Sequence, residues 1–364
     1  MIRIEGLTIL FDSFKIMDLN IKIEEEEFHF LLGPTGSGKT LILESVIGLH
    51  KPKQGKIWIS EREVQDLPPE QREISYVPQD LALFPHLKVR ENILYGIKAR
   101  NLKMKKYEEY VETLIQVMKI GHLLDRYPAN LSGGEKKRVA LLRALTPKPK
   151  LILLDEPLSA LDPSIKAEIQ QLLKTLHSSF HPTILCVTHD IEEAYFLSNR
   201  ITIFMDGEVE QVGDRDDIFS RPKSRKVAQF LGARNLYQAK ILRKDELLQR
   251  WILGVADVQF SMPMSLCRDS MEVGREVDLF IRPEEVMIVR EGKPVKESLK
   301  RNIFLGKIMD IDERRRYQTV YLQTIEGKIP IEIAIPHYAF RNLDLSIGKI
   351  VNVALREESL WVME

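Results

Sequence analysis

Eight residues near the N-terminus constrain this chain more than any other stretch. They read Gly33-Pro-Thr-Gly-Ser-Gly-Lys-Thr40 and match the phosphate-binding loop pattern G-x-x-x-x-G-K-T. The apolar run 28–32 before them predicts a buried strand, and 41–48 after them predicts a helix with an apolar face. Glycines let backbone N–H groups surround phosphate oxygens, and a helix N-terminus adds a favourable dipole. The sequence therefore predicts that this loop binds a nucleotide.

The end of this loop predicts two specific contacts. In loops of this pattern the lysine, here Lys39, reaches the β- and γ-phosphates, and the following hydroxyl, here Thr40, binds Mg²⁺. The candidate nucleotide contacts are Gly33, Pro34, Thr35, Gly36, Ser37, Gly38, Lys39 and Thr40.

Polar residues follow two further apolar runs. Asp155 and Glu156 come directly after the run 151–154, and His189 ends the predicted strand 183–189. In a phosphate-loop fold, an acid at the tip of the neighbouring strand orients Mg²⁺ through water, which fits Asp155. Glu156 fits a general base for the attacking water. A lone histidine is more often structural, but at the carboxyl end of a parallel strand we interpret His189 as functional.

Three more features indicate anion or base binding. Ser132-Gly-Gly134 precedes a helix predicted for 136–145, and a serine N-cap with two glycines forms a second anion-binding helix terminus. Gln79 ends the predicted strand 74–79. Phe11 and Phe14 lie upstream of the phosphate loop, and each either packs in the core or offers a face to adenine.

Composition limits the classes of protein. The 364 residues suggest two or three domains, and 53 basic against 53 acidic residues give no reason to expect nucleic acid as a partner. No apolar run approaches the roughly 18 residues of a membrane span. The start Met1–Glu5 carries no signal-peptide pattern, and two lone cysteines, Cys186 and Cys267, argue against a disulfide framework. We therefore expect a cytoplasmic protein.

The pattern of predicted secondary structure changes near residue 233. Before it, strand-like and helix-like segments alternate, with helical periods over 88–127, 164–176 and 214–232. After it, short alternating strands follow one another, at 237–242, 277–281, 304–311, 320–323, 328–335 and 350–355. The sequence thus predicts an α/β phosphate-loop nucleotide-binding domain over 1–232. An all-β domain of one or two OB-like small barrels is predicted over 233–364. The acidic run 24–27 predicts a solvated turn, and the arginines of 313–317 predict a hairpin tip.

Taken together, these motifs resemble those of the ATP-binding subunits of ABC transporters. The matching segments stand in the family's order and at its usual spacings: the phosphate loop, Gln79, 131–135, 151–156, 159–162 and His189. The resemblance covers residues 1–232, with Glu135 where the family usually has Gln. It implies a two-lobed α/β fold with a helical subdomain. It also implies a head-to-tail dimer of two copies, each phosphate loop facing Ser132, Gly133, Gly134 and Glu135 of the other copy across a bound ATP.

The resemblance also implies roles for individual residues. Phe11 is expected to stack on adenine, where the family often has Tyr, and Asp162 to contact the opposite copy. Glu156 is expected to polarise the attacking water, and His189 to hold the γ-phosphate and that water. The expected catalytic residues are Lys39, Gln79, Glu156 and His189. The expected Mg²⁺ contacts are Thr40, Gln79 and Asp155.

Further segments resemble importer-type subunits. Phe84-Pro-His-Leu87, with 89–93, resembles the corresponding segment of these subunits. In them, the segment after the residue that matches Gln79 forms part of the groove that receives a cytoplasmic helix of the permease. The strand 277–285 resembles the "I-R-P-E" strand of the barrel appended to importer ATPases, and 301–306 with 347–356 resembles a molybdate-binding barrel. This implies the ATPase of a molybdate or tungstate importer at the cytoplasmic face of the membrane. Its implied partners are integral membrane permease subunits and, indirectly, an extracytoplasmic solute-binding protein.

The barrel departs from the molybdate pattern at two places. Its usual S-x-R-N motif has Leu299 in place of Ser, and its oxyanion-binding loop reads Ile335-Pro-His-Tyr338. Arg301 and Arg356 are candidate oxyanion ligands, with ordinary surface arginines as the alternative. Other importer substrates stay open: sulfate, a polyamine, a sugar or iron. A non-transport ABC ATPase and an oxyanion-binding module without ATPase activity are less favoured alternatives.

Overall fold

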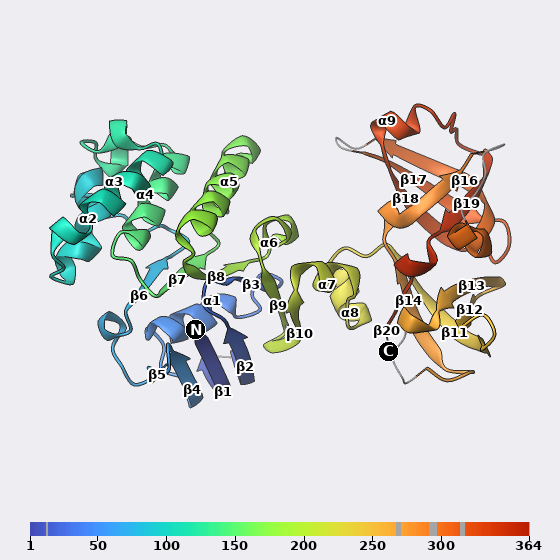
Figure 1. The fold of residues 1–364 in the computed structure, drawn as a ribbon, viewed down its shortest axis with the longest axis horizontal. Helices are drawn as coiled ribbons and strands as arrows, with labels where there is room; N and C mark the ends of the chain where they lie inside the picture. The colour runs from blue at the N-terminus through green and yellow to red at the C-terminus, as the bar shows by residue number, and fades with distance from the viewer. Residues whose placement is uncertain (12–13, 267–270, 291–296, 314–316, 364) are drawn as a thin grey trace. The chain divides into compact units, whose positions relative to one another are not determined.

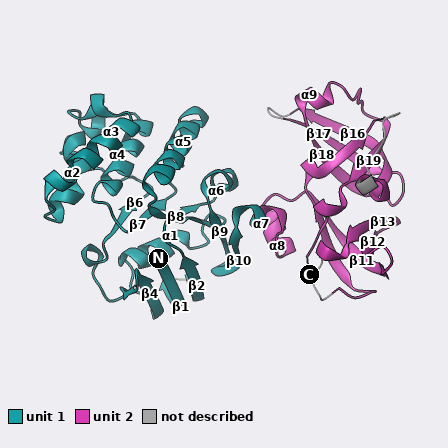
Figure 2. Cartoon of the chain, viewed as in Figure 1, with its two compact units in different colours: residues 1–218 teal, residues 219–364 magenta. Residues whose placement is uncertain are grey.

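The computed structural model describes residues 1–11, 14–266, 271–290, 297–313 and 317–363. The chain divides into two compact units, residues 1–218 and 219–364 (Figure 2). The contact boundary precedes the expected functional boundary at 232/233, which stays a prediction. Cys267 and the arginines 314–316 lie outside the described residues. No helix of the described residues is long and apolar enough to cross a membrane.

The first unit contains two sheets. A four-stranded antiparallel sheet has the order β2-β1-β4-β5, and a six-stranded sheet has the order β10-β9-β3-β8-β7-β6. All neighbours in the six-stranded sheet are parallel except β10 and β9. The strands are β1 (Ile2–Phe11), β2 (Phe14–Ile23), β3 (Phe28–Leu32), β4 (Gln54–Ile59), β5 (Arg62–Glu63), β6 (Ile74–Val77), β7 (Leu151–Asp155), β8 (Thr183–Thr188), β9 (Arg200–Met205) and β10 (Glu208–Asp214).

Helices α2, α3 and α4 gather into a group of their own beside the sheets, which is the predicted helical subdomain (Figure 1). The helices of this unit are α1 (Lys39–Ile47), α2 (Val89–Ala99), α3 (Glu108–Val117), α4 (Gly133–Leu145), α5 (Pro163–Phe180), α6 (Ile191–Leu197) and α7 (Arg215–Ser220). Short 3-10 turns are η1 (Pro69–Gln71), η2 (Met104–Lys106), η3 (Gly121–Leu123) and η4 (Pro128–Asn130).

Strands β3, β7 and β8 are buried along their whole length. This is the pattern of parallel strands covered on both faces, and it explains why their sequences are mostly apolar. One hydrophobic core joins the antiparallel sheet, α1 and the central strands. The exposed polar residues near these strands therefore follow the strand ends, as His189 does after β8.

The described residues of the second unit form mainly β-strands, with short helices between them. Its antiparallel sheets have the orders β13-β12-β11-β14-β20 and β15-β19-β16-β17-β18, and both contribute to one hydrophobic core. The elements are α8 (Arg225–Phe230), β11 (Asn235–Asp245), β12 (Arg250–Val255), β13 (Val258–Pro263), η5 (Met264–Leu266), β14 (Glu276–Ile281), η6 (Pro283–Glu285), β15 (Val286–Val289), η7 (Glu297–Asn302), β16 (Ile303–Glu313), β17 (Tyr317–Thr324), β18 (Pro330–Pro336), α9 (His337–Phe340), β19 (Ile350–Leu355), η8 (Glu357–Ser359) and β20 (Trp361–Met363).

The structure corrects two predicted elements. The helix predicted over 214–232 is wrong: Asp214 ends strand β10, and two short helices, α7 and α8, follow it. Pro222 lies between them, where it interrupts any continuous helix. The helix predicted to start at residue 136 starts at Gly133, because Ser132 caps it one turn earlier.

Candidate functional site

The carboxyl ends of the parallel strands β3, β7 and β8 meet at one edge of the six-stranded sheet. Leu32 of β3 pairs with Thr188 of β8, and Asp155 of β7 pairs with Val187. The residues just beyond these ends are therefore neighbours, as two main-chain bonds show. The N–H of Gly33 donates to Thr188 O over 3.3 Å, and that of Glu156 donates to Val187 O over 3.0 Å. This edge brings the phosphate loop, Asp155, Glu156 and His189 together.

The phosphate loop connects β3 to α1, as predicted. Gly36 and Gly38 have φ angles of +81° and +96°, in the left-handed region that favours glycine. A Cβ on Gly33 would lie 1.9 Å from the carbonyl oxygen of Phe204, so only glycine fits there. No side chain caps the start of α1, which leaves its first N–H groups available to an anion.

Lys39 is a buried cation that donates to three oxygen atoms of its own loop. Its side chain is 6% exposed, and its ammonium donates to Gly33 O at 2.8 Å, Pro34 O at 2.7 Å and Ser37 Oγ at 3.3 Å. No carboxylate of the described residues forms an ion pair with it, although Glu156 and Asp155 attract it from further away. Burial lowers the pKa of Lys39 despite that attraction. A phosphate group would supply the missing negative charge.

Asp155 is a buried carboxylate held by two hydroxyl groups. It is 3% exposed, and it accepts hydrogen bonds from Thr40 Oγ1 and from the hydroxyl of Tyr76, both over 3.3 Å. Burial raises the pKa of Asp155, and these two hydrogen bonds only partly oppose that effect. Burial, together with the nearby carboxylate, also raises the pKa of Tyr76. The Thr40–Asp155 contact joins two of the three predicted Mg²⁺ residues, and sequence reasoning missed Tyr76.

Glu156 and His189 are in direct contact. His189 Nδ1 lies 2.9 Å from Glu156 Oε1, with the histidine 51% and the glutamate 17% exposed. Glu156 has φ +43°, an uncommon backbone conformation for a residue with a side chain. The structure therefore brings together the predicted base and the predicted phosphate-sensing histidine.

Gln79 lies two residues beyond the end of β6 and is exposed. Arg143 of α4 holds the segment after Gln79 by two hydrogen bonds. Its guanidinium donates to Leu81 O at 2.7 Å and Ala82 O at 2.6 Å. Leu81 and Ala82 both have positive φ angles, 66° and 41°. The same guanidinium lies 5.2 Å from the centre of the Phe84 ring. Sequence reasoning missed Arg143, because its spacing from Gln79 carries no local signal.

The second helix terminus forms a capping box. Ser132 Oγ accepts from the N–H of Glu135 over 3.3 Å, and Glu135 Oε2 accepts from the N–H of Ser132 over 2.7 Å. These bonds lower the pKa of Glu135. Glu135 thus has the capping role that a Gln can also fill. Ser132 and Gly133 are exposed, so they are accessible to a second molecule.

The two upstream aromatics differ in environment. Phe11 is 43% exposed and meets His50 edge-on, with 5.0 Å between ring centres. Phe14 packs against the phosphate loop, where a Cβ on Gly38 would lie 2.3 Å from Phe14 Cε1. Adenine stacking on Phe11 stays a prediction, while Phe14 supports the loop.

Both candidate oxyanion ligands of the second unit are engaged with carboxylates. Arg301 Nη1 lies 3.4 Å from Glu357 Oε1, and Arg356 Nη1 lies 3.5 Å from Glu285 Oε2. Glu357 is 2% exposed and also pairs with Arg250. An oxyanion would have to compete with these carboxylates, and the site stays a prediction.

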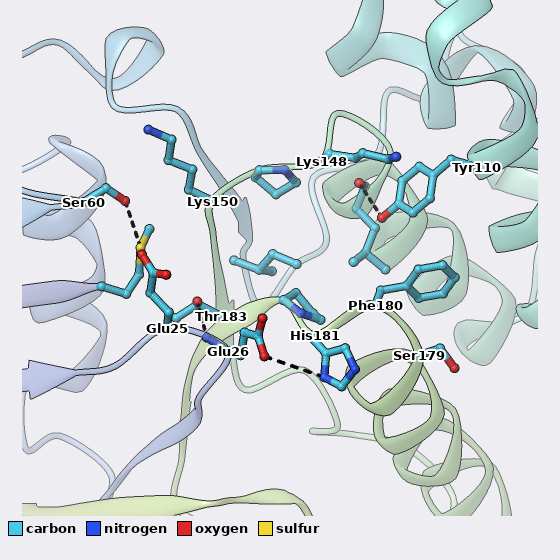
Figure 3. Close-up of a pocket in the computed structure, with 15 residues that line it drawn as sticks. Glu25, Glu26, Ser60, Tyr110, Lys148, Lys150, Ser179, Phe180, His181 and Thr183 are labelled. Atoms are coloured by element: carbon cyan, nitrogen blue, oxygen red, sulfur yellow. Dashed lines mark hydrogen bonds and ion pairs between the residues drawn. The ribbon is translucent and has the colours of Figure 1, made fainter.

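A cavity of about 710 Å³ lies elsewhere in the first unit (Figure 3). It is lined by residues such as Tyr110, Lys148, Phe180 and His181, and by none of the predicted nucleotide contacts. Thr183 in its lining starts β8, so the cavity lies at the amino end of the strand whose carboxyl end carries His189. The phosphate-loop edge, where the charges and the uncapped helix start converge, stays the predicted nucleotide site.

The residues at this edge fit ATP and Mg²⁺. The glycine loop, the uncapped helix start and the unpaired Lys39 suit phosphate oxygens, and Thr40 beside Asp155 suits a cation that retains most of its water. Such a site, with a glutamate and a histidine in contact, defines the class of phosphate-loop ATPases.

Comparison with known proteins places the chain within that class. A family model described as "ABC transporter" matches residues 16–159. A molybdate/tungstate import ATP-binding protein of Pyrococcus horikoshii is 38% identical over 86% of both chains. The chain therefore belongs to the ABC transporter family, and it is an ATPase of that family.

Further relatives and a solved structure also carry the names of ATP-binding proteins. The molybdate/tungstate import ATP-binding protein of Pyrococcus abyssi is 35% identical over 362 residues, all of both chains. A spermidine/putrescine import ATP-binding protein of Vibrio cholerae is 34% identical over 89% of this chain and 83% of its own. A dimeric ATP-binding cassette bound to ADP and Pi covers 59% of this chain and 99% of its own, with a TM-score of 0.52 and 30% identity.

Proposed function

We propose that this chain hydrolyses ATP to energise an importer of molybdate- or tungstate-type oxyanions. The observation that carries the proposal is the end-to-end similarity to the molybdate/tungstate import ATP-binding protein of Pyrococcus abyssi. That similarity includes the all-β second unit, which a nucleotide-binding domain alone does not need.

The proposed hydrolysis uses the geometry of the sheet edge. Lys39 binds the phosphates, Glu156 accepts a proton from the attacking water, and His189, in contact with Glu156, holds that water and the terminal phosphate. Mg²⁺, when bound, neutralises phosphate charge, and Thr40, Gln79 and Asp155 would hold it. The 2.9 Å contact between Glu156 and His189 supports this assignment, because a base must be oriented before it can act.

The proposed active form is a dimer. Ser132 and Gly133 are exposed at the start of α4, and Gly133 offers its N–H group to an anion that a second copy carries. The dimeric state of the solved ATP-binding cassette supports this arrangement. Each site would then consist of the phosphate loop of one copy and residues 132–135 of the other.

The proposed partners are membrane permease subunits and, through them, an extracytoplasmic solute-binding protein. The chain would bind at the cytoplasmic face of the membrane as a peripheral subunit. The segment 81–87, held by Arg143 beyond the exposed Gln79, is the proposed docking surface for a permease helix. A permease that moves this segment would also move Gln79.

Polyamine import is the second candidate. The similarity to the spermidine/putrescine import protein of Vibrio cholerae favours it at nearly the same identity. The two candidates differ in the charge of the solute, since oxyanions are negative and polyamines positive. A transport assay separates them directly.

The test uses the complete transporter. The chain is co-expressed with candidate permease and solute-binding proteins, and uptake of labelled tungstate and of labelled spermidine is measured. The proposal expects ATP-dependent tungstate uptake that Glu156→Gln abolishes. Spermidine uptake without tungstate uptake would overturn the oxyanion assignment.

Titration of the full chain with molybdate, with Arg301→Ala and Arg356→Ala as variants, tests the predicted site in the second unit.

A further inference from the structure

Lys137 of α4 is a buried lysine that the proposed mechanism does not use. It is 6% exposed, and its ammonium donates to the carbonyl oxygen of Ser159 over 2.7 Å. No carboxylate of the described residues forms an ion pair with it. Burial of an ammonium without a paired carboxylate costs free energy, which the hydrogen bond to Ser159 O only partly offsets.

Ser159 belongs to the turn that carries Glu156. The N–H and the Oγ of Ser159 both donate to the carbonyl oxygen of Glu156, over 3.1 Å and 2.8 Å. Glu156 and Ala160 both have positive φ angles, 43° and 56°. A turn with two such residues holds its shape only when surrounding contacts fix it. Lys137 supplies one of these contacts from outside the turn.

The same helix begins at the exposed Ser132. Gly134, in its first turn, packs so closely that an added Cβ would lie 2.7 Å from Ile165 Cγ2 of α5. The start of α4, the turn 156–162 and the start of α5 are therefore packed together. A movement of Ser132 along the axis of α4 would pull on Ser159 through Lys137.

Charged groups from three elements surround Lys137. Glu193 of α6 and Glu156 attract its ammonium, and Lys166 of α5 repels it. Glu193 is itself held, since Glu193 Oε1 pairs with Lys166 Nζ over 2.7 Å and Glu193 Oε2 accepts from Thr188 Oγ1 over 2.9 Å. Thr188 directly precedes His189. This network therefore also fixes the main chain next to His189.

We propose that Lys137 is a positioning residue for ATP hydrolysis, which holds the turn carrying Glu156 at a fixed place relative to the helix start at Ser132. In one copy of the chain, Lys137 thus connects two regions. One is the helix start at Ser132, which completes the site of the other copy, and the second is Glu156, the proposed base of its own site. This inference rests on the proposed dimeric function, because only there does Ser132 meet a nucleotide. Burial lowers the pKa of Lys137 to about 8, so the link weakens as the ammonium loses its proton in mildly alkaline solution.

The test measures steady-state ATP hydrolysis by the full chain with Mg²⁺. Lys137→Met keeps the length of the side chain and removes the donor. We expect kcat to fall about tenfold or more with KM for ATP within about twofold, because small displacements of a base cost more in rate than in binding. Lys136→Met makes the same change one residue away, at a lysine that makes no bond to the turn, and is expected to match wild type.

A pH profile separates positioning from a structural role. Wild-type kcat is expected to fall above pH about 8, where Lys137 loses its proton. Lys137→Gln is a neutral donor that does not titrate, so its kcat is expected to lack this alkaline fall. This variant also serves if Lys137→Met does not fold.

Two results would overturn the inference: a kcat of Lys137→Met within about twofold of wild type, or an alkaline limb of Lys137→Gln identical to that of wild type. The wild-type chain in the same assay distinguishes a failure of the Lys137 inference from a failure of the proposed function. Wild type without hydrolysis or dimers contradicts the proposed function, whereas an active wild type with an equally active Lys137→Met contradicts only the role of Lys137.

Discussion

His189 Nδ1 lies 2.9 Å from Glu156 Oε1, although the two residues directly follow different strands and are 33 positions apart. The contact exists because β7 and β8 are parallel neighbours whose carboxyl ends coincide. It places an exposed imidazole beside a half-buried carboxylate at the edge where the phosphate loop also ends.

Replacing Glu156 by Gln is expected to lower ATP hydrolysis by about 10²–10⁴-fold, because an amide cannot accept the proton of the attacking water. Nucleotide binding is expected to persist, so ATP-bound dimers accumulate and are measured by gel filtration with light scattering. Glu192→Gln alters an exposed glutamate in the first turn of α6 and serves as the control. Normal hydrolysis by Glu156→Gln would remove Glu156 from the role of base.

Lys39→Met is expected to abolish the stabilisation that ATP gives to the folded chain. In wild type, a ligand that binds only the native state raises the melting temperature, and phosphate neutralises the buried ammonium. The measurement is the melting temperature with and without ATP and Mg²⁺. The variant without ATP is expected to melt no lower than wild type, since it loses an unpaired buried charge. An equal ATP-dependent rise in both proteins would contradict the assignment of Lys39.

Asp155 makes the stability of the nucleotide-free chain depend on pH in a predictable direction. Burial raises the pKa of Asp155 above its ordinary value, so between the two values the folded state binds more protons than the unfolded state. Its contribution to stability therefore falls as pH rises through that interval and stays low above it.

Asp155→Asn is expected to remove this dependence and to stabilise the nucleotide-free chain at neutral pH. Urea unfolding at several pH values measures both effects. Asp66→Asn changes an exposed surface carboxylate and is the matched control. A variant with the same pH dependence as wild type would show that another carboxylate is responsible.

Ser132→Ala is expected to destabilise the chain by about 1 kcal/mol, the usual value of an N-cap serine. The loss arises because the N–H of Glu135 loses the Ser132 Oγ that accepts its hydrogen bond. Glu135→Gln retains an acceptor for the N–H of Ser132 and is expected to change stability little. Thermal unfolding compares the two variants, and an equal loss in both would argue against the capping box.

Arg143→Lys is expected to loosen the segment after Gln79. A lysine cannot donate to Leu81 O and Ala82 O in the forked geometry of a guanidinium. Amide hydrogen exchange over residues 80–88 is expected to become faster while exchange in β7 stays slow. Arg90→Lys, at an exposed position of α2, is the control. Unchanged exchange in both variants would show that other contacts hold the segment.

The nucleotide edge could be predicted from the sequence because each of its parts is local. A phosphate loop needs a strand, glycines and a helix in immediate succession, and the buried runs before Asp155 and His189 are continuous and apolar. Parallel pairing then brings these strand ends together. The contacts of Tyr76, Lys137 and Arg143 could not be predicted, because each depends on packing between elements far apart in the chain.

Local patterns also misled where long-range contacts decide the structure. The acidic run 24–27 reads as a solvated turn, and that prediction was wrong for Glu27. Its carboxylate is 6% exposed and accepts from the N–H of Glu24, and Glu27 Oε1 lies 2.6 Å from Nδ1 of the buried His29. The hairpin of β12 and β13 was missed because Ala256 and Asp257 form its turn in place of the usual glycine or asparagine.

The buried ammonium of Lys39, which no carboxylate of the described residues pairs, also affects laboratory practice. Any small tetrahedral anion can supply the charge that this lysine lacks, so sulfate or phosphate in a purification buffer would occupy the loop before nucleotide is added. Nucleotide affinities measured in such buffers would describe exchange of one anion for another. Chloride-based, phosphate-free solutions are therefore the appropriate reference state for this protein.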